Sequence, residues 1–98
     1  MGIAKQYLKS KPVCKVTFTV PAEEAKKVAV VGDFNEWNPK KSELKKLKNG
    51  TFKGTLELPK EGTFEFKYWV DGDFVNEAKA DRYQWNDYAG AENSVLEL

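Results

Sequence analysis

The chain has 98 residues, of which 41% are hydrophobic and 32% are charged, with 16 basic against 15 acidic side chains. A chain of this length forms one domain around a single core and has no room for a deep cleft between two lobes. The composition is that of a folded globular protein, and a net charge of +1 gives no overall field for nucleic acid or for a membrane surface. We therefore expect neither of these partners.

The first 12 residues, "MGIAKQYLKSKP", lack the apolar run of about 7 to 15 residues that a signal peptide needs. We interpret residues 1–12 as an N-terminal arm, mobile or loosely docked, ahead of a single domain formed by residues 13–98. Cys14 is the only cysteine, so an internal disulfide is excluded, and its place in an apolar alternation predicts a small core residue. For the location of the protein we favour the cytoplasm.

Alternation with a period of two dominates the first half of the chain. In "CKVTFTV" (residues 14–20) apolar side chains share one face and Lys or Thr the other, which predicts a half-buried strand. "KKVAVVG" (residues 26–32) is apolar on both faces and predicts a central strand. Because these segments alternate with turn residues and show no helical period, we expect a protein made mainly of strands.

Two hairpin signals follow. A weak strand within residues 44–47 precedes Asn49-Gly50, a dipeptide suited to a type I′ turn, and "TFKGTLEL" (residues 51–58) repeats the alternation. Asp71-Gly72 is the second signal.

The strand predicted at residues 63–70, "TFEFKYWV", has two different faces. One face carries Phe64, Phe66, Tyr68 and Val70. The opposite face carries Glu65, Lys67 and Trp69. Strands near Phe74 and at residues 93–98 complete a set of about seven, with turn signals every 8 to 12 residues or so, which predicts an all-β, immunoglobulin-like antiparallel β-sandwich. A small barrel is the alternative.

The residues needed for catalysis are scarce. The chain has no His, and Cys14 is expected in the core, so the usual hydrolase dyads and triads have no parts. Asp71 and Asp73 flank a turn glycine, but an EF-hand calcium loop would need an oxygen ligand and a Gly where Val75 and Asn76 stand. We favour a simple hairpin turn, and we expect a domain that is not an enzyme and has no metal or cofactor.

A cluster of lysines forms the strongest local charge: Lys40, Lys41, Lys45, Lys46 and Lys48. Together with nearby aromatic residues it could form a nucleic-acid patch. We favour a solvated strand and edge, which lysines protect from aggregation, because acidic residues elsewhere cancel the charge.

Three motifs occur in order along the chain: "GDFNEWNP" (residues 32–39), "FEFKYWVDGDF" (64–74) and "AGAENSV" (89–95). Together they resemble carbohydrate-binding module family 48, the glycogen-binding domain of the AMP-activated protein kinase β subunit. This domain is also the N-terminal domain of branching and debranching enzymes and occurs alone in bacterial isoamylase early-set proteins. The resemblance covers roughly residues 13–98 and implies an early-set β-sandwich that binds α-1,4-glucans such as glycogen, starch or maltooligosaccharides.

The resemblance also implies a binding site. Trp37 matches the first sugar-stacking Trp of the family, and Lys67 matches a Lys that forms hydrogen bonds with the sugar. Phe74 occupies the second stacking position, usually Trp in the kinase subunit, and Asn93 matches the Asn of the closing segment.

Two positions depart from the family pattern. Ala89 stands where the kinase subunit has a larger apolar residue that reaches through the sugar ring, and Ala91 stands at a hydroxyl position. The affinity and the preferred chain length therefore do not follow from the family pattern.

The chemistry of glucose fits the same four residues. A glucose ring has an apolar face of C–H groups and a rim of hydroxyls, so aromatic platforms at Trp37 and Phe74 and polar partners at Lys67 and Asn93 suit it. An open groove of this kind predicts a Kd between roughly 1 μM and 1 mM. Each residue also has a purely structural interpretation. Trp37 could be a ring folded over the core, and Phe74 could pack at an edge. Lys67 could be a solvated lysine and Asn93 a turn residue.

Other aromatic residues support a competing hypothesis. Trp69 shares the face of Lys67, and "DRYQWNDY" gathers Tyr83, Trp85 and Tyr88 beside an Arg. Exposed Tyr and Trp near Arg are typical of protein–protein hot spots, so a protein-binding β-sandwich, natural or engineered, is the alternative. Rings in one groove beside Lys67 and Asn93 favour a glucan, whereas a flat patch away from them favours a protein partner.

Overall fold

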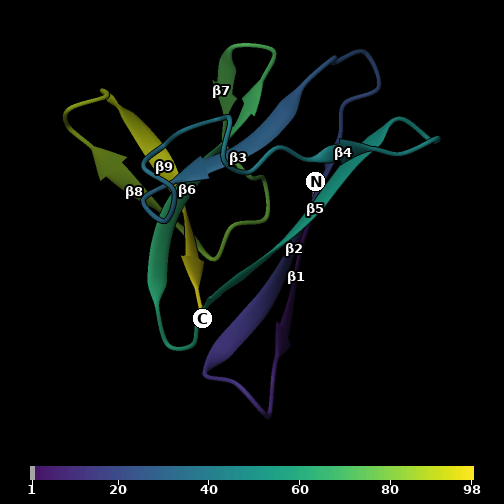
Figure 1. Ribbon diagram of the computed structural model, residues 1–98. Coiled ribbons are helices and arrows are strands. Elements are labelled where there is room, and N and C mark those ends of the chain that lie inside the picture. Colours follow the sequence, from purple (N-terminus) through teal and green to yellow (C-terminus); the bar gives the residue numbers. More distant parts are fainter. Residues whose placement is uncertain (1) are drawn as a thin grey trace.

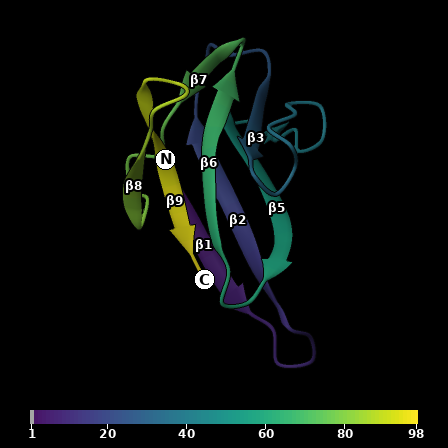
Figure 2. The same cartoon turned by 90° about the vertical axis from the view of Figure 1, so that its left-hand side faces the viewer.

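The computed structural model describes residues 2–98, which form two antiparallel sheets (Figure 1). One sheet has the order β1 (Gly2–Tyr7), β2 (Val13–Pro21), β5 (Thr51–Pro59) and β4 (Lys45–Lys46). The other has the order β3 (Val28–Gly32), β6 (Thr63–Val70), β9 (Ala91–Glu97) and β8 (Arg82–Asn86), and β7 (Asp73–Val75) also pairs with β6. Figure 2 shows the two layers one behind the other, which confirms the predicted β-sandwich. Among residues 2–98 no helix is long and apolar enough to cross a membrane.

The core lies between the inner faces of β2 and β5 on one side and β3, β6 and β9 on the other. Its buried strand residues are Cys14, Val16, Phe18, Val20, Val28, Val30, Phe52, Leu58, Phe66, Tyr68 and Leu96. The ring of Phe18 meets Phe66 edge to face with centroids 5.6 Å apart, and it meets Tyr68 at 6.2 Å. Such contacts add to the hydrophobic stabilisation of the buried rings. The alternation in the sequence thus predicted the buried face of both layers, Cys14 included.

Strand β1 lies inside the segment expected to be an N-terminal arm. It pairs with β2 along its whole length, from Gly2 opposite Thr19 to Tyr7 opposite Cys14. The Nζ of Lys5 lies 2.7 Å from an Asp81 carboxylate oxygen and thus reaches the other layer. The sequence did not predict this strand because its side chains are exposed or only half-buried, which leaves no clear alternation. The domain boundary at residue 13 stays a prediction.

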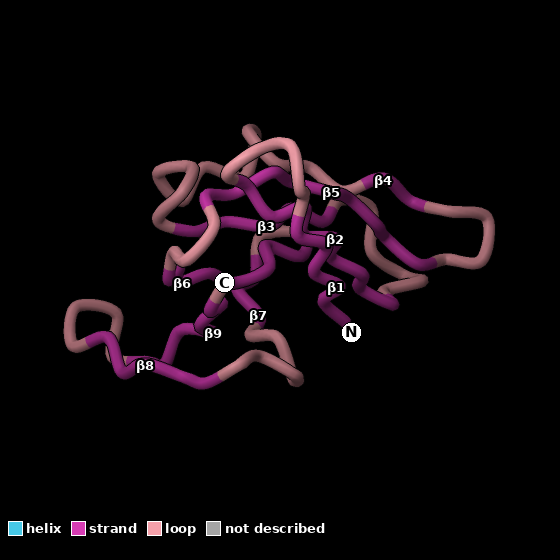
Figure 3. Tube along the Cα trace, turned by 90° about the horizontal axis from the view of Figure 1, so that it is seen from below, coloured by secondary structure: helices cyan, strands magenta, loops and turns pink. Residues whose placement is uncertain are grey.

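Strand β8 is the second strand that the sequence analysis missed. Four of its five residues are exposed, so its hydrophobic pattern is not that of a half-buried strand. It is held instead by backbone pairing with β9, from Arg82 opposite Val95 to Asn86 opposite Ala91. Figure 3 shows β8 and the loop to β9 extending beyond the rest of the molecule.

The two predicted hairpin turns have different outcomes. Asp71 and Gly72 have φ values of 47° and 97° and connect paired residues of β6 and β7, as a type I′ turn requires. At Asn49-Gly50 the type I′ prediction is wrong, since only Gly50 has a positive φ, of 85°. The side chain of Asn49 accepts the N–H of Thr51 at 3.0 Å, an Asx interaction that favours another turn geometry.

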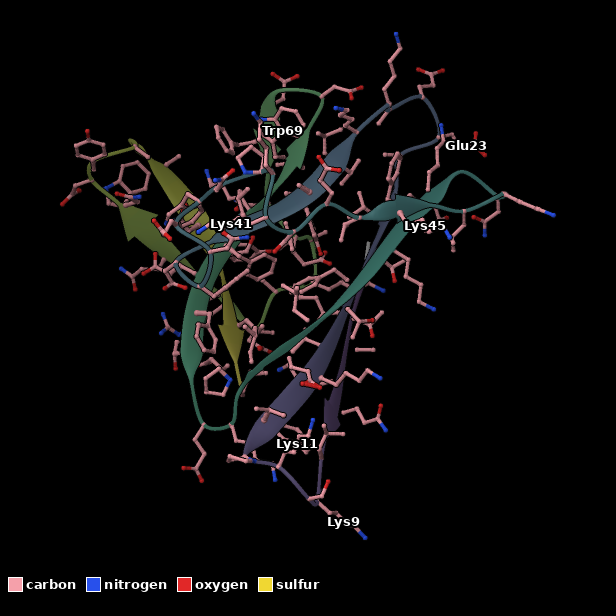
Figure 4. All side chains as sticks on the ribbon, in the orientation of Figure 1. Lys9, Lys11, Glu23, Lys41, Lys45 and Trp69 are labelled. Atoms are coloured by element: carbon pink, nitrogen blue, oxygen red, sulfur yellow. The ribbon has the colours of Figure 1, made fainter. Side chains whose placement is uncertain are left out.

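The lysine-rich segment forms the exposed edge of its sheet, as predicted. Strand β4 consists of Lys45 and Lys46, and Figure 4 shows Lys45 beside this edge. The Nζ of Lys46 donates to the carbonyl oxygen of Glu23 at 2.8 Å and lies 5.6 Å from the centroid of the Phe52 ring. The lysine stem therefore covers part of an aromatic side chain while the charge lies at the surface.

Replacing Phe18 by Ala tests the core. The substitution removes a fully buried ring and its two aromatic contacts, so we expect the free energy of unfolding to fall by about 3 to 5 kcal/mol. Urea unfolding measures the change. Lys15→Ala, on the exposed face of the same strand, is the matched control and is expected to change it by less than about 0.5 kcal/mol. Equal effects of the two substitutions would contradict this packing.

Candidate functional site

The four residues predicted to bind sugar line one cavity of about 390 Å³. We call it the site cavity, and its lining residues are Trp37, Lys67, Phe74, Asn86, Tyr88, Ala89 and Asn93. These side chains come from the loop after β3, from β6 and β7, and from the β8–β9 hairpin. In the pairing of β6 with β9, Phe66 lies opposite Ser94. The next residue of β6 is Lys67 and the preceding residue of β9 is Asn93, so these two side chains share the outer face of the sheet.

Asn35 fixes the loop that carries Trp37. Its amide oxygen accepts the N–H of Gly32 at 3.0 Å, and its amide nitrogen donates to Val30 O and to Ser42 Oγ, each at 3.0 Å. The backbone N–H of Trp37 donates to Gly32 O at 2.9 Å. Asn35 is itself buried, so these hydrogen bonds are shielded from water and define one loop conformation.

The backbone of this loop is strained at the position of the aromatic ring. Glu36 and Trp37 have φ values of 59° and 55°, a left-handed conformation that costs side-chain-bearing residues about 1 to 3 kcal/mol each. Trp37 is half-buried and is not among the core residues. The interpretation of Trp37 as a ring folded over the core is therefore wrong, and the ring lines the site cavity instead.

Glu65 orients the amide of Asn93. The Asn93 nitrogen donates to Glu65 Oε1 at 3.1 Å, and since a carboxylate only accepts, this contact determines which end of the amide is which. The Asn93 side chain is almost fully buried yet lines the cavity. Lys67 takes part in none of the ion pairs formed within residues 2–98, so its ammonium group is not neutralised by a protein carboxylate.

The β6–β7 hairpin presents Phe74 to the site cavity. Phe74 is 59% exposed and lies opposite Trp69 across the two strands. The hairpin is held by Asp71, whose carboxylate accepts the N–H of Lys27 at 2.8 Å and of Lys26 at 3.0 Å. The hydrogen bond from Lys27, followed by that from Lys26, lowers the pKa of Asp71 below its usual value. A ring of this size, exposed at a fixed position, is typical of a ligand platform.

The other predicted aromatic surface does not act as one unit. Trp69, labelled in Figure 4, is half-buried. It does not line the site cavity. The hydroxyl of Tyr83 donates to Glu77 O at 2.5 Å. Tyr88 is fully exposed and lines the site cavity, whereas Trp85 pairs with Glu92 and so lies on the strand face opposite the one that carries Asn93. These rings are therefore divided between different surroundings.

The β8–β9 loop adds residues that the sequence analysis did not assign to the sugar site. The side-chain oxygen of Asn86 accepts the N–H of Tyr88 at 3.0 Å and of Ala89 at 3.3 Å, which closes the loop tightly. Tyr88 thus lies beside Ala89, the position at which a small side chain departs from the family pattern. Ala91 pairs with Asn86 in the strands and does not line the cavity. The sequence did not assign Asn86 to the sugar site because the β8–β9 hairpin itself was not predicted.

A larger cavity, of about 800 Å³, lies elsewhere. It is lined by Pro21, Ala22, Glu23, Glu24, Ala25, Asn49, Thr51, Val70, Asp71 and Asp73. It has no aromatic side chain, and the Asp71 carboxylate there already accepts backbone N–H groups. The smaller site cavity is the better candidate because it combines exposed rings with an unneutralised cation and a fixed amide.

The chain matches a known protein family. Residues 14–98 match the family described as the glycogen recognition site of AMP-activated protein kinase. The chain belongs to this family. The resemblance inferred from the three sequence motifs is thereby confirmed, and the domain is a carbohydrate-binding module of the glycogen-recognising type. A search of curated proteins found no match.

The pKa of Asp71 makes the stability of this glycogen-recognition module pH-dependent. Because the folded-state pKa lies below the unfolded value, Asp71 stabilises the fold at pH values above about 4, and this contribution is lost as the pH falls through the folded-state value. We expect the unfolding midpoint of the protein to fall more on acidification from about pH 5 to about pH 2 than that of Asp71→Asn. Thermal unfolding monitored by circular dichroism measures the difference. Parallel curves for the two proteins would contradict this role of Asp71.

Proposed function

We propose that this domain binds α-1,4-glucan without catalysis, with Trp37 and Phe74 stacking on sugar rings and with Lys67 and Asn93 bonding to hydroxyls. The observation that carries the proposal is the convergence of these four side chains on one cavity in a chain of the glycogen-recognition family. They come from three separate parts of the sequence, so their meeting depends on the fold and not on local spacing.

The polar groups of the site cavity complement a hydroxyl rim. The Lys67 ammonium supplies donors only, whereas the Asn93 amide supplies both donors and an acceptor. Since Asn93 is already oriented by Glu65, binding does not have to immobilise its amide. A preformed site of this kind supports reversible binding in the micromolar to millimolar range proposed from the sequence.

The absence of catalysis is part of the proposal. The sequence contains no His, and Cys14 is completely buried, so neither residue type can serve as a base or nucleophile at the surface. We propose that the domain acts as a tether that holds a partner protein or enzyme on glycogen or starch. The cytoplasmic location stays a prediction.

Protein binding through Tyr83, Trp85, Tyr88 and Trp69 is the competing function. Tyr88 lines the site cavity together with Asn93, and Tyr83 is tied to the backbone of its own chain. This distribution favours the glucan over a flat protein interface.

Trp37→Ala tests the proposed function. We expect maltoheptaose to bind the protein saturably, with a Kd between roughly 1 μM and 1 mM, and to bind the variant at least about 10-fold more weakly. Isothermal titration calorimetry measures both affinities. Tyr7→Ala, which removes an exposed ring far from the site cavity in sequence and outside its lining, is the control and should bind as the parent does. A parent protein that gives no binding heat at millimolar sugar would contradict the proposal.

Phe74→Trp tests the second platform. A larger ring covers more of the sugar face, so we expect the affinity for maltoheptaose to rise about 2- to 5-fold, while Phe74→Ala lowers it. The same calorimetric titration measures both changes, with Tyr7→Ala, outside the lining of the site cavity, as the control. If neither Phe74 substitution altered the affinity, Phe74 would not contact the sugar.

A further inference from the structure

A third aromatic ring lines the site cavity besides the two already assigned to the sugar. It belongs to Tyr88, in the loop between β8 and β9, whereas Trp37 follows β3 and Phe74 lies on β7. Three separate parts of the chain thus bring one ring each to the same cavity. The proposed function gives a role to two of these rings and none to Tyr88.

The backbone beneath Tyr88 is fixed. The loop joins the paired residues Asn86 and Ala91, and the Asn86 side-chain oxygen accepts the N–H of Tyr88 at 3.0 Å and that of Ala89 at 3.3 Å. The N–H of Gly90 donates to the carbonyl oxygen of Asn86 at 2.9 Å, and Gly90 has a φ of 65°, which glycine adopts without strain. The fold therefore determines the point at which the Tyr88 side chain leaves the loop.

The Tyr88 side chain itself contributes nothing to the packing of the domain. It is 101% exposed, so the ring buries almost no surface against the rest of the described chain. The next residue, Ala89, adds only a methyl group to the lining of the site cavity, which leaves room for the neighbouring ring to turn towards a ligand. The apolar surface of the Tyr88 ring is thus available to a bound molecule.

Tyr88 lies at the Trp37 end of the site cavity. These two residues also border an adjoining cavity of about 490 Å³, whereas Phe74 and Lys67 do not. The adjoining cavity is lined mainly by polar atoms and the site cavity mainly by apolar atoms, so the apolar parts of the shared rings belong to the site cavity. A ligand that stacks on Trp37 therefore has the Tyr88 ring beside it.

The chemistry of a tyrosine side chain suits both surfaces of a glucose unit. The ring can pack on the apolar C–H face, and the phenolic hydroxyl can donate to or accept from a hydroxyl of the rim. Tyrosine has only two side-chain torsions, so ordering an exposed tyrosine on a ligand costs less entropy than ordering a long aliphatic side chain. Tyr88 can therefore be free in the unbound domain and still add to the affinity.

We propose that Tyr88 is a third sugar-binding ring, which turns onto the α-glucan unit stacked on Trp37 and covers part of the surface that Trp37 leaves open. This inference rests on the proposed function, since the glucan must first occupy the site cavity. It means that the sugar orders a side chain that the free domain leaves in solvent, and that part of the binding surface forms only when the glucan is bound.

Tyr88→Ala tests this role by calorimetric titration with maltoheptaose. We expect the variant to bind about 3- to 10-fold more weakly than the parent, because one ring contact is lost, and to keep the unfolding midpoint of the parent, because the ring is fully exposed. Tyr88→Phe keeps the ring and is expected to bind within about 2-fold of the parent. Tyr7→Ala removes an exposed tyrosine outside the cavity lining and serves as the matched control.

NMR of the parent protein gives a second, direct measurement. On titration with maltoheptaose we expect the ring C–H signals of Tyr88 and the indole N–H signal of Trp37 to shift with the same Kd, while the ring signals of Tyr7 stay in place.

The outcomes separate the two levels of the argument. Unchanged affinity in Tyr88→Ala, a lowered unfolding midpoint of that variant, or shifts at Trp37 without shifts at Tyr88 would overturn the role of Tyr88 and leave the proposed function intact. Equal weakening in Tyr88→Phe and Tyr88→Ala would overturn the ring contact in favour of a bond from the hydroxyl alone. A parent protein that shows neither binding heat nor a shift at Trp37 would overturn the proposed function, and the role of Tyr88 with it.

Discussion

The two-residue period of β6 is the constraint on which the rest of the structure depends. This strand pairs with β3, β7 and β9, so its register determines the placement of most of its sheet. Phe66 and Tyr68 point into the core, and the alternation then obliges Glu65, Lys67 and Trp69 to face outward. A slip by one residue would exchange the two sets and destroy the core and the site together.

Three loops complete the site, and each is held by one Asn or Asp side chain that bonds to backbone groups. Asn35 holds the Trp37 loop, Asp71 holds the hairpin of Phe74, and Asn86 closes the β8–β9 loop. Such short polar side chains favour tight, non-extended backbone conformations. The rings are therefore displayed on rigid supports, which reduces the entropy lost when a flexible polysaccharide binds.

The part of the fold that could be predicted from the sequence consists of the strands with buried side chains. The buried strands β2, β3, β5 and β6 alternate or are wholly apolar, so the sequence predicted the sandwich and the outward face of Lys67. Strands β1 and β8 are held by backbone pairing with few buried side chains, and backbone hydrogen bonds leave no hydrophobic pattern. Asn86 and Tyr88 belong to the β8–β9 hairpin, which explains why the sequence did not place them beside Trp37, Phe74 and Asn93 in one cavity.

Strand β1 lies outside the residues that match the family, yet it pairs with residues 14–19 of β2 along one edge. Without it, residues 14–19 of β2 would also present a row of unpaired backbone groups, the arrangement through which separate molecules join edge to edge. The Lys5 ammonium, bonded to Asp81 and to the carbonyl oxygen of Glu97, holds β1 against the other layer. The free edge of this layer is therefore the six-residue β1 and not the nine-residue β2, and a shorter edge strand offers less backbone for a second molecule to pair with.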